Sequence, residues 1–327
     1  MAKLMDTVKD ALRTGGYAYK TEQTYSGWIE KYVRFHLPKH PRETGTEGVK
    51  AYMTFLAVAK NYSPQTQNQA LAAILFLYRV LGVEIGDVSL ARAKKETHLP
   101  TVLTEDEVAR VLEQMTGVYR IMTELLYGGG LRLMECLRLR VKDVDLENLS
   151  ITLRDTKSNR DRMTLLPASV VPALKLHLKK VQAQHEEDLA NGYGEVELPY
   201  ALAGKYPRAP YEWAWQYIFP AGQFSTDPRS GHVRRHHVFE TSLQKAVKEA
   251  ARKAKIAKPV TPHVLRHCFA THLVRRGVDI RTVQELLGHK DLETTMIYVH
   301  TMEMRDVVSP LDRIQSRRII QRDVVES

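Results

Sequence analysis

Four side chains between residues 261 and 300 have types and spacings that suit phosphate chemistry. His263 and Arg266 stand three apart, so on a helix they share a face beside the anion-attracting amides of the helix N-terminus. His289 follows a glycine that could end the next helix, and Tyr298 lies about two turns into a third. A cation, two imidazoles and a phenol could therefore converge on one anion. Taken singly, each also fits a solvated arginine, a half-buried tyrosine or a hydrogen-bonding histidine.

A further arginine stands in YGGGLRLMECLRLRVKDVD. The three glycines permit a close backbone turn before a helix, and no Lys-Ser/Thr follows them, so a nucleotide P-loop is unsupported. Arg132 would fall in the first turn of that helix, where an anion is favoured. It could equally be a surface arginine.

The segment ISITLRDTKSNRDRMTLLP alternates apolar and polar residues and predicts a hairpin. Ile151 and Leu153 share one face, and Met163 and Leu165 follow a polar turn. Lys157 lies in or beside that turn, where a mobile ammonium could reach into a cleft. On its own it would be a solvated lysine.

The helices that would carry the C-terminal set have well-marked ends. Thr261 is a good N-cap, and Pro262 takes the first helical position. Gly277 could close the first helix in a left-handed conformation, and Gly288 could close the second.

Residues 1–89 are predicted to be all helical. The apolar positions of TYSGWIEKYVRF form one helical stripe, and Ser63 with Pro64 opens another helix. We expect a small bundle with a modest positive excess, which suits gripping a DNA backbone or plain packing. Residues 90–99 indicate a charged linker, and a Thr104–Glu107 capping box starts a second domain.

Composition favours a polyanionic partner. The 327-residue chain is 43% hydrophobic and 26% charged, with a net charge of +10 and a pI near 9.4. No run approaches about 18 apolar residues, and the N-terminus is too charged for a signal peptide. Cys136 and Cys268 give neither a metal nor a disulfide pattern and should be packing residues. We expect a cytoplasmic protein with no metal, cofactor or membrane partner.

The ordered set HxLRH, then LLGH, then a tyrosine nine residues on resembles the C-terminal signature of the tyrosine recombinases. These form the phage-integrase family of DNA strand-transfer enzymes. GxRxxE resembles the family's first catalytic arginine motif, and this resemblance implies that Glu135 orients a neighbour and does not act on the substrate. The resemblance implies a mainly α fold with a small antiparallel β-sheet. An N-terminal helical DNA-binding bundle would precede a catalytic domain at 100–314 and a tail at 315–327. The implied catalytic residues are Arg132, Lys157, His263, Arg266, His289 and Tyr298.

Breaking a phosphodiester without a metal requires cations at the nonbridging oxygens, a nucleophile and an acid for the leaving oxygen. In the family's scheme Arg132 and Arg266 clamp the phosphate, and Tyr298 attacks it to give a 3′-phosphotyrosyl link and a free 5′-hydroxyl. His263 is the better candidate for the base. Lys157 would protonate the leaving oxygen.

His289 would hydrogen bond a nonbridging oxygen in the same scheme. The covalent link conserves the phosphodiester energy, so a second strand can reverse the step without ATP. The family uses four protomers around a synapse. The segment at 307–314 would dock into a neighbouring protomer or pack on its own domain.

Residues 198–220 hold seven of the chain's 25 aromatic residues, and the basic run HVRRHH follows soon after. Aromatic faces beside Arg and His suit stacking on unpaired bases, although an aromatic mini-core could look the same. An insertion at about 190–230 resembles that of integron integrases, which recombine gene cassettes and recognise bases flipped out of a folded single-stranded site. The positions matching its base-contacting motif are Lys205, Trp215, Pro228, His236 and His237.

The expected partners are therefore folded single-stranded cassette sites and duplex attachment sites, with the protein on the nucleoid when bound. Two alternatives remain open. One is a recombinase of the phage or chromosome-resolution type that acts on ordinary duplex. The other is a non-catalytic DNA-binding protein on the same scaffold. A type IB topoisomerase would leave the aromatic insertion unexplained.

Overall fold

The computed structural model describes residues 2–88, 101–154, 161–199, 202–228, 230–289, 291 and 294–296. It divides into two compact units, Met1–His98 and Leu99–Ser327. The predictions for Lys157, Tyr298, the linker at 90–99 and the segments at 307–314 and 315–327 fall outside the described residues.

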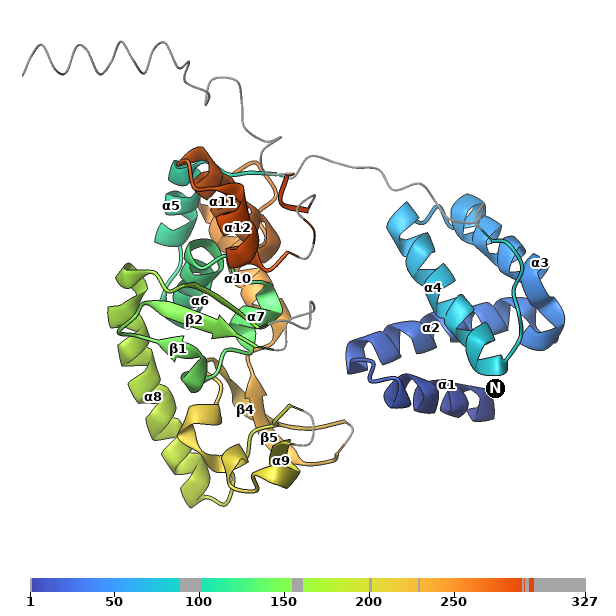
Figure 1. Ribbon diagram of the computed structural model, residues 1–327, viewed down its shortest axis with the longest axis horizontal. Coiled ribbons are helices and arrows are strands. Elements are labelled where there is room, and N and C mark those ends of the chain that lie inside the picture. The colour runs from blue at the N-terminus through green and yellow to red at the C-terminus, as the bar shows by residue number, and fades with distance from the viewer. Residues whose placement is uncertain are drawn as a thin grey trace, which may run out of the picture. The chain divides into compact units, whose positions relative to one another are not determined.

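The N-terminal unit is a helical bundle, as predicted (Figure 1). Its elements are α1 (Ala2–Thr14), α2 (Tyr19–His36), α3 (Pro41–Thr54), the π-helical turn η1 (Phe55–Ala59) and α4 (Pro64–Leu81). The predicted stripe of α2 is buried through Trp28, Ile29, Tyr32 and Val33. The Ser63 hydroxyl caps α4, as its Ser-Pro start predicted.

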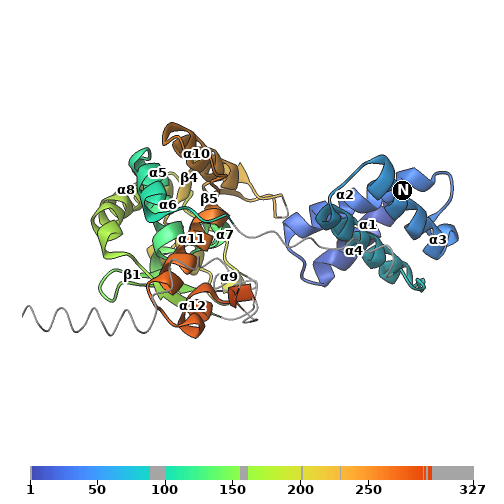
Figure 2. The same ribbon diagram turned by 90° about the horizontal axis from the view of Figure 1, so that it is seen from above.

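The C-terminal unit is mainly helical. Its helices are α5 (Glu105–Glu113), α6 (Gly117–Gly128), α7 (Leu133–Leu137), η3 (Val141–Asp143), η4 (Ala168–Val170), α8 (Val171–Ala190), α9 (Leu202–Lys205), η5 (Ala209–Tyr211), η6 (Trp213–Trp215), α10 (Glu240–Lys253), α11 (Pro262–Arg275) and α12 (Ile280–Leu287). The main core lies where α5, α6, α10 and α11 meet, and α12 packs beside α11 (Figure 1, Figure 2). Buried Cys136 and Cys268 are packing residues, as expected.

Two small antiparallel sheets complete this unit. The first has the order β1–β2–β3, and the second is the hairpin β4–β5. The strands are β1 (Val144–Asp145), β2 (Ser150–Leu153), β3 (Arg162–Leu165), β4 (Pro220–Thr226) and β5 (Val233–His237). The fold class predicted from the sequence, mainly α with a small antiparallel sheet, is therefore confirmed.

The predicted hairpin pairing of β2 with β3 is confirmed, and the apolar side chains of β3 face outward. Ile151 and Leu153 are buried, whereas Met163 is 61% exposed and Leu165 is 46% exposed. The inward residues of β3 are instead Arg162 and Thr164. Polar groups can occupy these positions because each has a buried partner; the Thr164 hydroxyl donates to the Gly129 carbonyl at 2.7 Å.

The predicted helix ends are confirmed. The Thr261 hydroxyl accepts a hydrogen bond from the backbone amide of Val264, and the Thr104–Glu107 capping box is complete. Gly288 closes α12 at φ 63°, in the left-handed region. These ends fix where α11 and α12 begin and stop around the candidate site.

Candidate active site

A glycine turn brings the chain close to α11 before the first predicted arginine. Gly130 has φ +61°, and a Cβ there would lie 2.4 Å from the ring of Phe269, so only glycine fits. Arg132 is the N-cap of α7, one position before the helix, and not in its first turn as predicted. Its amide donates to the Glu135 carboxylate at 2.8 Å, and this bond sets where α7 starts.

Glu135 is surrounded by three guanidinium groups. Nη1 of Arg132 lies 2.6 Å from one carboxylate oxygen. Arg162 approaches both oxygens, at 2.8 and 3.3 Å. Nη1 of Arg266 lies 3.7 Å from Oε2. The geometry agrees with the expectation that Glu135 orients its neighbours.

The C-terminal end of α12 holds the same three arginines through consecutive carbonyl groups. Nε of Arg162 donates to the carbonyl of Leu286 at 3.1 Å, and Nη2 of Arg266 donates to that of Leu287 at 2.6 Å. Nη2 of Arg132 donates to the carbonyl of residue 288 at 3.4 Å. The last carbonyls of a helix lack intrahelical donors and carry partial negative charge, which suits cations.

Arg266 is the most deeply buried of the three, with 2% of its side chain exposed. Besides its bond to α12, its Nη1 donates to the Gly130 carbonyl, and its Nη2 lies 3.4 Å from Nε2 of His289. The glycine turn and the end of α12 therefore fix this guanidinium from two sides.

Three histidines lie beside the arginines, and all have lowered pKa values. Burial, followed by the charges of the neighbouring arginines, lowers the pKa of His289 to about 3. Burial and the neighbouring His263 and Arg266 lower the pKa of His267 to about 4. The His263 ring is 4.2 Å from that of His267, and its pKa is lowered by desolvation and then by Arg266 and Arg132. All three imidazoles are therefore neutral at neutral pH.

The structure thus gathers Arg132, His263, Arg266 and His289 in one place. The lowered pKa of His263, caused by desolvation and then by Arg266 and Arg132, suits the base expected at this position. Sequence reasoning did not single out Arg162 or His267. His267 stands within the quoted HxLRH motif, whereas Arg162 could be found only by knowing which face of β3 points inward.

This arrangement can bind a phosphate through guanidinium groups, with neutral imidazoles in place to accept or share a proton. Over the described part of the chain, no three His, Cys, Asp or Glu side chains lie together as metal ligands would. Within the same residues, no helix is long and apolar enough to cross a membrane.

The aromatic insertion is joined to the rest of the unit through Arg140, whose exposed fraction is only 8%. Its guanidinium donates to the carbonyls of Trp215 at 2.6 Å and Glu197 at 2.7 Å. It also lies 4.7 Å from the centre of the Tyr217 ring. Nζ of Lys142 lies 2.9 Å from the centre of the half-buried Trp215 ring, so a cation covers one face of that indole.

The rings of His236 and His237 both lie against the ring of Tyr217. Their rings lie 5.4 and 5.5 Å from that of Tyr217. Nε2 of His236 is 3.7 Å from the Glu197 carboxylate, and burial lowers the pKa of His237 to about 4. Tyr217 also belongs to a small core formed with Val196, Leu198 and Ala209. The insertion therefore contains both a mini-core and a group of rings, of which Trp215 and His236 are partly accessible while Tyr217 and His237 are buried.

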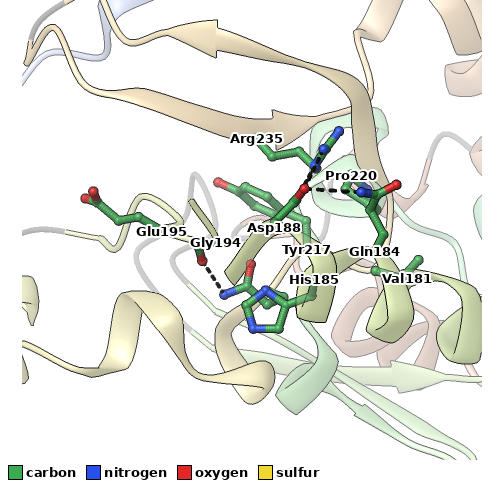
Figure 3. Close-up of a pocket in the computed structure, with 10 residues that line it drawn as sticks. Val181, Gln184, His185, Asp188, Gly194, Glu195, Tyr217, Pro220 and Arg235 are labelled. Atoms are coloured by element: carbon green, nitrogen blue, oxygen red, sulfur yellow. Dashed lines mark hydrogen bonds and ion pairs between the residues drawn. The ribbon is translucent and has the colours of Figure 1, made fainter. Parts of the chain in front are cut away.

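A buried ion pair fastens the β4–β5 hairpin to α8. The Arg235 guanidinium binds both carboxylate oxygens of Asp188, which also accepts a hydrogen bond from Gln184 at 3.1 Å (Figure 3). The register pairs Pro220 with His237, at the hairpin end that lies next to Tyr217.

Two of the five predicted base-contacting residues lie apart from this ring cluster. Pro228 is exposed beyond the paired end Thr226–Val233, at the opposite end of the hairpin from His237. Lys205 is exposed at the end of α9, with its ammonium 5.4 Å from the ring of Tyr206. His236 and His237 lie against Tyr217, and the Arg140 guanidinium lies over both Tyr217 and Trp215, at 4.7 and 5.7 Å from the ring centres.

Two family models match the chain. Residues 101–305 match the phage integrase family, and residues 4–87 match the phage integrase N-terminal SAM-like domain. An integrase/recombinase of Escherichia coli is 44% identical over 316 residues, which cover 95% of this chain and 94% of that protein. The tyrosine recombinase XerD of Agrobacterium fabrum is 31% identical, over 80% of this chain and 78% of its own.

Solved structures show the same fold. A lambda integrase dimer bound to a core site aligns with a TM-score of 0.62 at 17% identity, over 95% of this chain and 99% of that one. The XerH site-specific recombinase bound to its difH substrate aligns with a TM-score of 0.60 at 20% identity, over 92% and 82%.

Proposed function

This chain belongs to the phage integrase family, the tyrosine site-specific recombinases that cleave and rejoin DNA, and we propose that it integrates and excises gene cassettes at folded single-stranded sites. The observation that carries the cassette specificity is the ring cluster of the insertion, in which Tyr217, His236 and His237 lie together and Arg140 links Tyr217 to Trp215, whose other cation is Lys142. Aromatic and imidazole faces next to cations suit bases that are free of the duplex.

For the chemistry, we assign Arg132 and Arg266 to the two nonbridging oxygens of the scissile phosphate. The phenolic oxygen of Tyr298 forms the new bond to phosphorus, and the bond from phosphorus to the 5′-oxygen breaks. His263 accepts the phenol proton, because its lowered pKa leaves a free imidazole nitrogen at neutral pH. Lys157 gives a proton to the 5′-oxygen.

His289 is placed to share a nonbridging oxygen with the buried arginine, from which it is separated by 3.4 Å. Nδ1 of the same ring meets the Thr295 hydroxyl at 2.9 Å, which fixes the ring plane. With a pKa of about 3, this imidazole is neutral in the protein before DNA binds, and we assign it as a hydrogen-bond partner, not as an acid.

In the insertion, we assign Trp215 and the His236–His237 pair to one extrahelical base. Lys142 covers one face of the indole, so a base would stack on the other. Pro228 and Lys205 would contact the nucleic acid at further points along its path, since the structure separates them from the rings.

The remaining assignments concern assembly. We assign residues 1–89 to gripping the DNA backbone, residues 100–314 to catalysis and residues 307–314 to docking, with four protomers on two sites. The reaction takes place on DNA in the cytoplasm.

The test uses the bottom strand of a cassette site, folded with its extrahelical bases, beside the top strand and the full duplex. Each carries a nick next to the cleavage position, so that a covalent protein–DNA adduct accumulates. We expect adduct with the bottom strand, lost in Tyr298→Phe. Binding without any adduct would support the non-catalytic alternative.

Specificity is read from Trp215→Ala, with Trp213→Ala as the matched control. Trp213 belongs to the same helical turn but packs beside His185, with ring centres 6.1 Å apart. We expect Trp215→Ala to lose the preference for the folded strand while still forming adduct on duplex, and Trp213→Ala to keep that preference. Equal wild-type binding to folded strand and duplex would favour the duplex-site alternative.

A further inference from the structure

One buried charge near the candidate active site has no part in the assigned reaction. Arg162 on β3 has only 6% of its side chain exposed. Its guanidinium meets both oxygens of Glu135, and its Nε donates to the last turn of α12 through the carbonyl of Leu286. One side chain therefore joins β3, α7 and α12.

The turn that carries His289 fits closely around Arg162. Gly288 has φ +63°, and a Cβ there would lie 2.5 Å from Cδ of Arg162. A residue other than glycine would be strained by its backbone and would displace the arginine. The backbone that presents His289 is thus shaped against this side chain.

The charges around Glu135 are unequal in number, because one carboxylate faces three guanidinium groups. Arg162 binds it through two nitrogens, the strongest arrangement for such a pair. Arg132 and Arg266 each approach it through one guanidinium nitrogen. The bidentate bond of Arg162 therefore takes up part of the negative charge that Arg132 also contacts at 2.6 Å, and three guanidinium groups around one carboxylate leave a net positive field.

On the basis of the proposed strand-transfer reaction, we propose that Arg162 is a positioning residue that neutralises Glu135 and thereby keeps Arg132 and Arg266 available to the scissile phosphate. Without Arg162, the carboxylate would hold the other two guanidinium groups, and the phosphate would have to compete with it. The loss would affect cleavage more than DNA binding, since many basic contacts share the binding energy.

The test measures the rate of adduct formation at saturating nicked bottom-strand DNA, together with the Kd. We expect Arg162→Gln to slow the rate by at least about tenfold, a barrier increase of about 1.4 kcal/mol, with a change in Kd of about threefold or less. Arg162→Lys keeps the charge but not the fork, so it should fall in between.

The decisive variant is Glu135→Gln combined with Arg162→Gln, which removes both charges and leaves a neutral amide side chain at each position. If Arg162 acts by neutralising Glu135, the double variant should cleave faster than Arg162→Gln alone. A merely structural role predicts a double variant that is equal or slower. Thermal unfolding of each variant identifies any that fails to fold, and in that case the comparison of Arg162→Lys with wild type decides.

Wild-type cleavage by Arg162→Gln, or a double variant no faster than Arg162→Gln, would overturn the inference and leave the proposed function intact. A wild-type protein that forms no adduct would overturn both.

Discussion

Replacing His237 with Gln should reduce the loss of stability that this protein suffers in mild acid. The imidazole is 8% exposed, and its Nδ1 lies 2.8 Å from the carbonyl of Val238. Burial, followed by the nearby His236 and Arg138, lowers its pKa from 6.5 to about 4. The folded protein therefore holds a neutral ring at a pH where the unfolded chain binds a proton.

The direction of the pH effect on stability follows from which state binds the proton. Below pH 6.5 the histidine of the unfolded state binds a proton, whereas His237 in the folded state binds one only near pH 4. The free energy of unfolding therefore decreases as the pH falls from 6.5 to about 4. From about pH 7.5 to about pH 5.5, this one ring should remove about 1.4 kcal/mol from the free energy of unfolding.

Urea unfolding at the two pH values measures this contribution. In a Trp28→Phe background, the fluorescence of Trp213 and Trp215 reports only the unit that contains His237. Tyr217→Phe is the matched control, because it alters packing against the same ring while burial holds the pKa of that phenol above its usual range, far from the window. His237→Gln should lose about 1.4 kcal/mol less than wild type on acidification, and the control should match wild type. If His237→Gln loses as much as wild type, the reasoning is refuted.

Three other perturbations address the packing around the two sites. Asp188→Ala should lower the free energy of unfolding by about 3–5 kcal/mol, since it leaves Arg235 without its bidentate partner, and adding Arg235→Met should recover part of this loss in urea unfolding. Gly130→Ala should cost more than about 1–2 kcal/mol in calorimetry, because a left-handed residue gains a Cβ 2.4 Å from Phe269; an unchanged Tm would contradict this. Thr164→Val should cost about 1–3 kcal/mol in urea unfolding by leaving a buried carbonyl of the glycine turn unpaired.

Features that depend on neighbours within a few residues could be predicted from the sequence. The Ser63 cap, the Thr104–Glu107 box, the Thr261 cap and the left-handed Gly288 each involve partners at most four residues away. The N-terminal helical bundle followed from the same local periodicity, whereas the mainly α class of the whole chain followed from the resemblance to the tyrosine recombinases.

Features that depend on distant partners could not be predicted. On β3, Met163 and Leu165 look like the inner face by hydrophobicity alone. Arg162 and Thr164 point inward because they form hydrogen bonds there with Glu135 and two backbone carbonyls. These partners lie 27 or more positions away in sequence. Hydrophobic alternation places a strand in a hairpin, but the buried polar partners decide which face is inside.

The insertion shows the same limit. The sequence placed Pro228, Lys205 and the histidine pair in one list of base contacts, yet the hairpin register puts Pro228 at the opposite end from His237. Residues at opposite ends of a hairpin cannot contact one base. If the insertion reads cassette DNA, it must meet the nucleic acid at more than one point.

The end of α12 explains why the LLGH motif accompanies the two arginines. Phosphodiester chemistry without a metal needs several guanidinium groups close together and largely removed from water, which is costly unless fixed dipoles replace that water. The carbonyls of Leu286, Leu287 and Gly288 each accept from a different arginine, and the glycine both ends the helix and leaves room for one of them. His289 then follows the left-handed turn, with its Nε2 3.4 Å from Arg266. The glycine and the histidine of the motif thus have separate physical tasks, while the residues before them supply backbone carbonyls to the arginines.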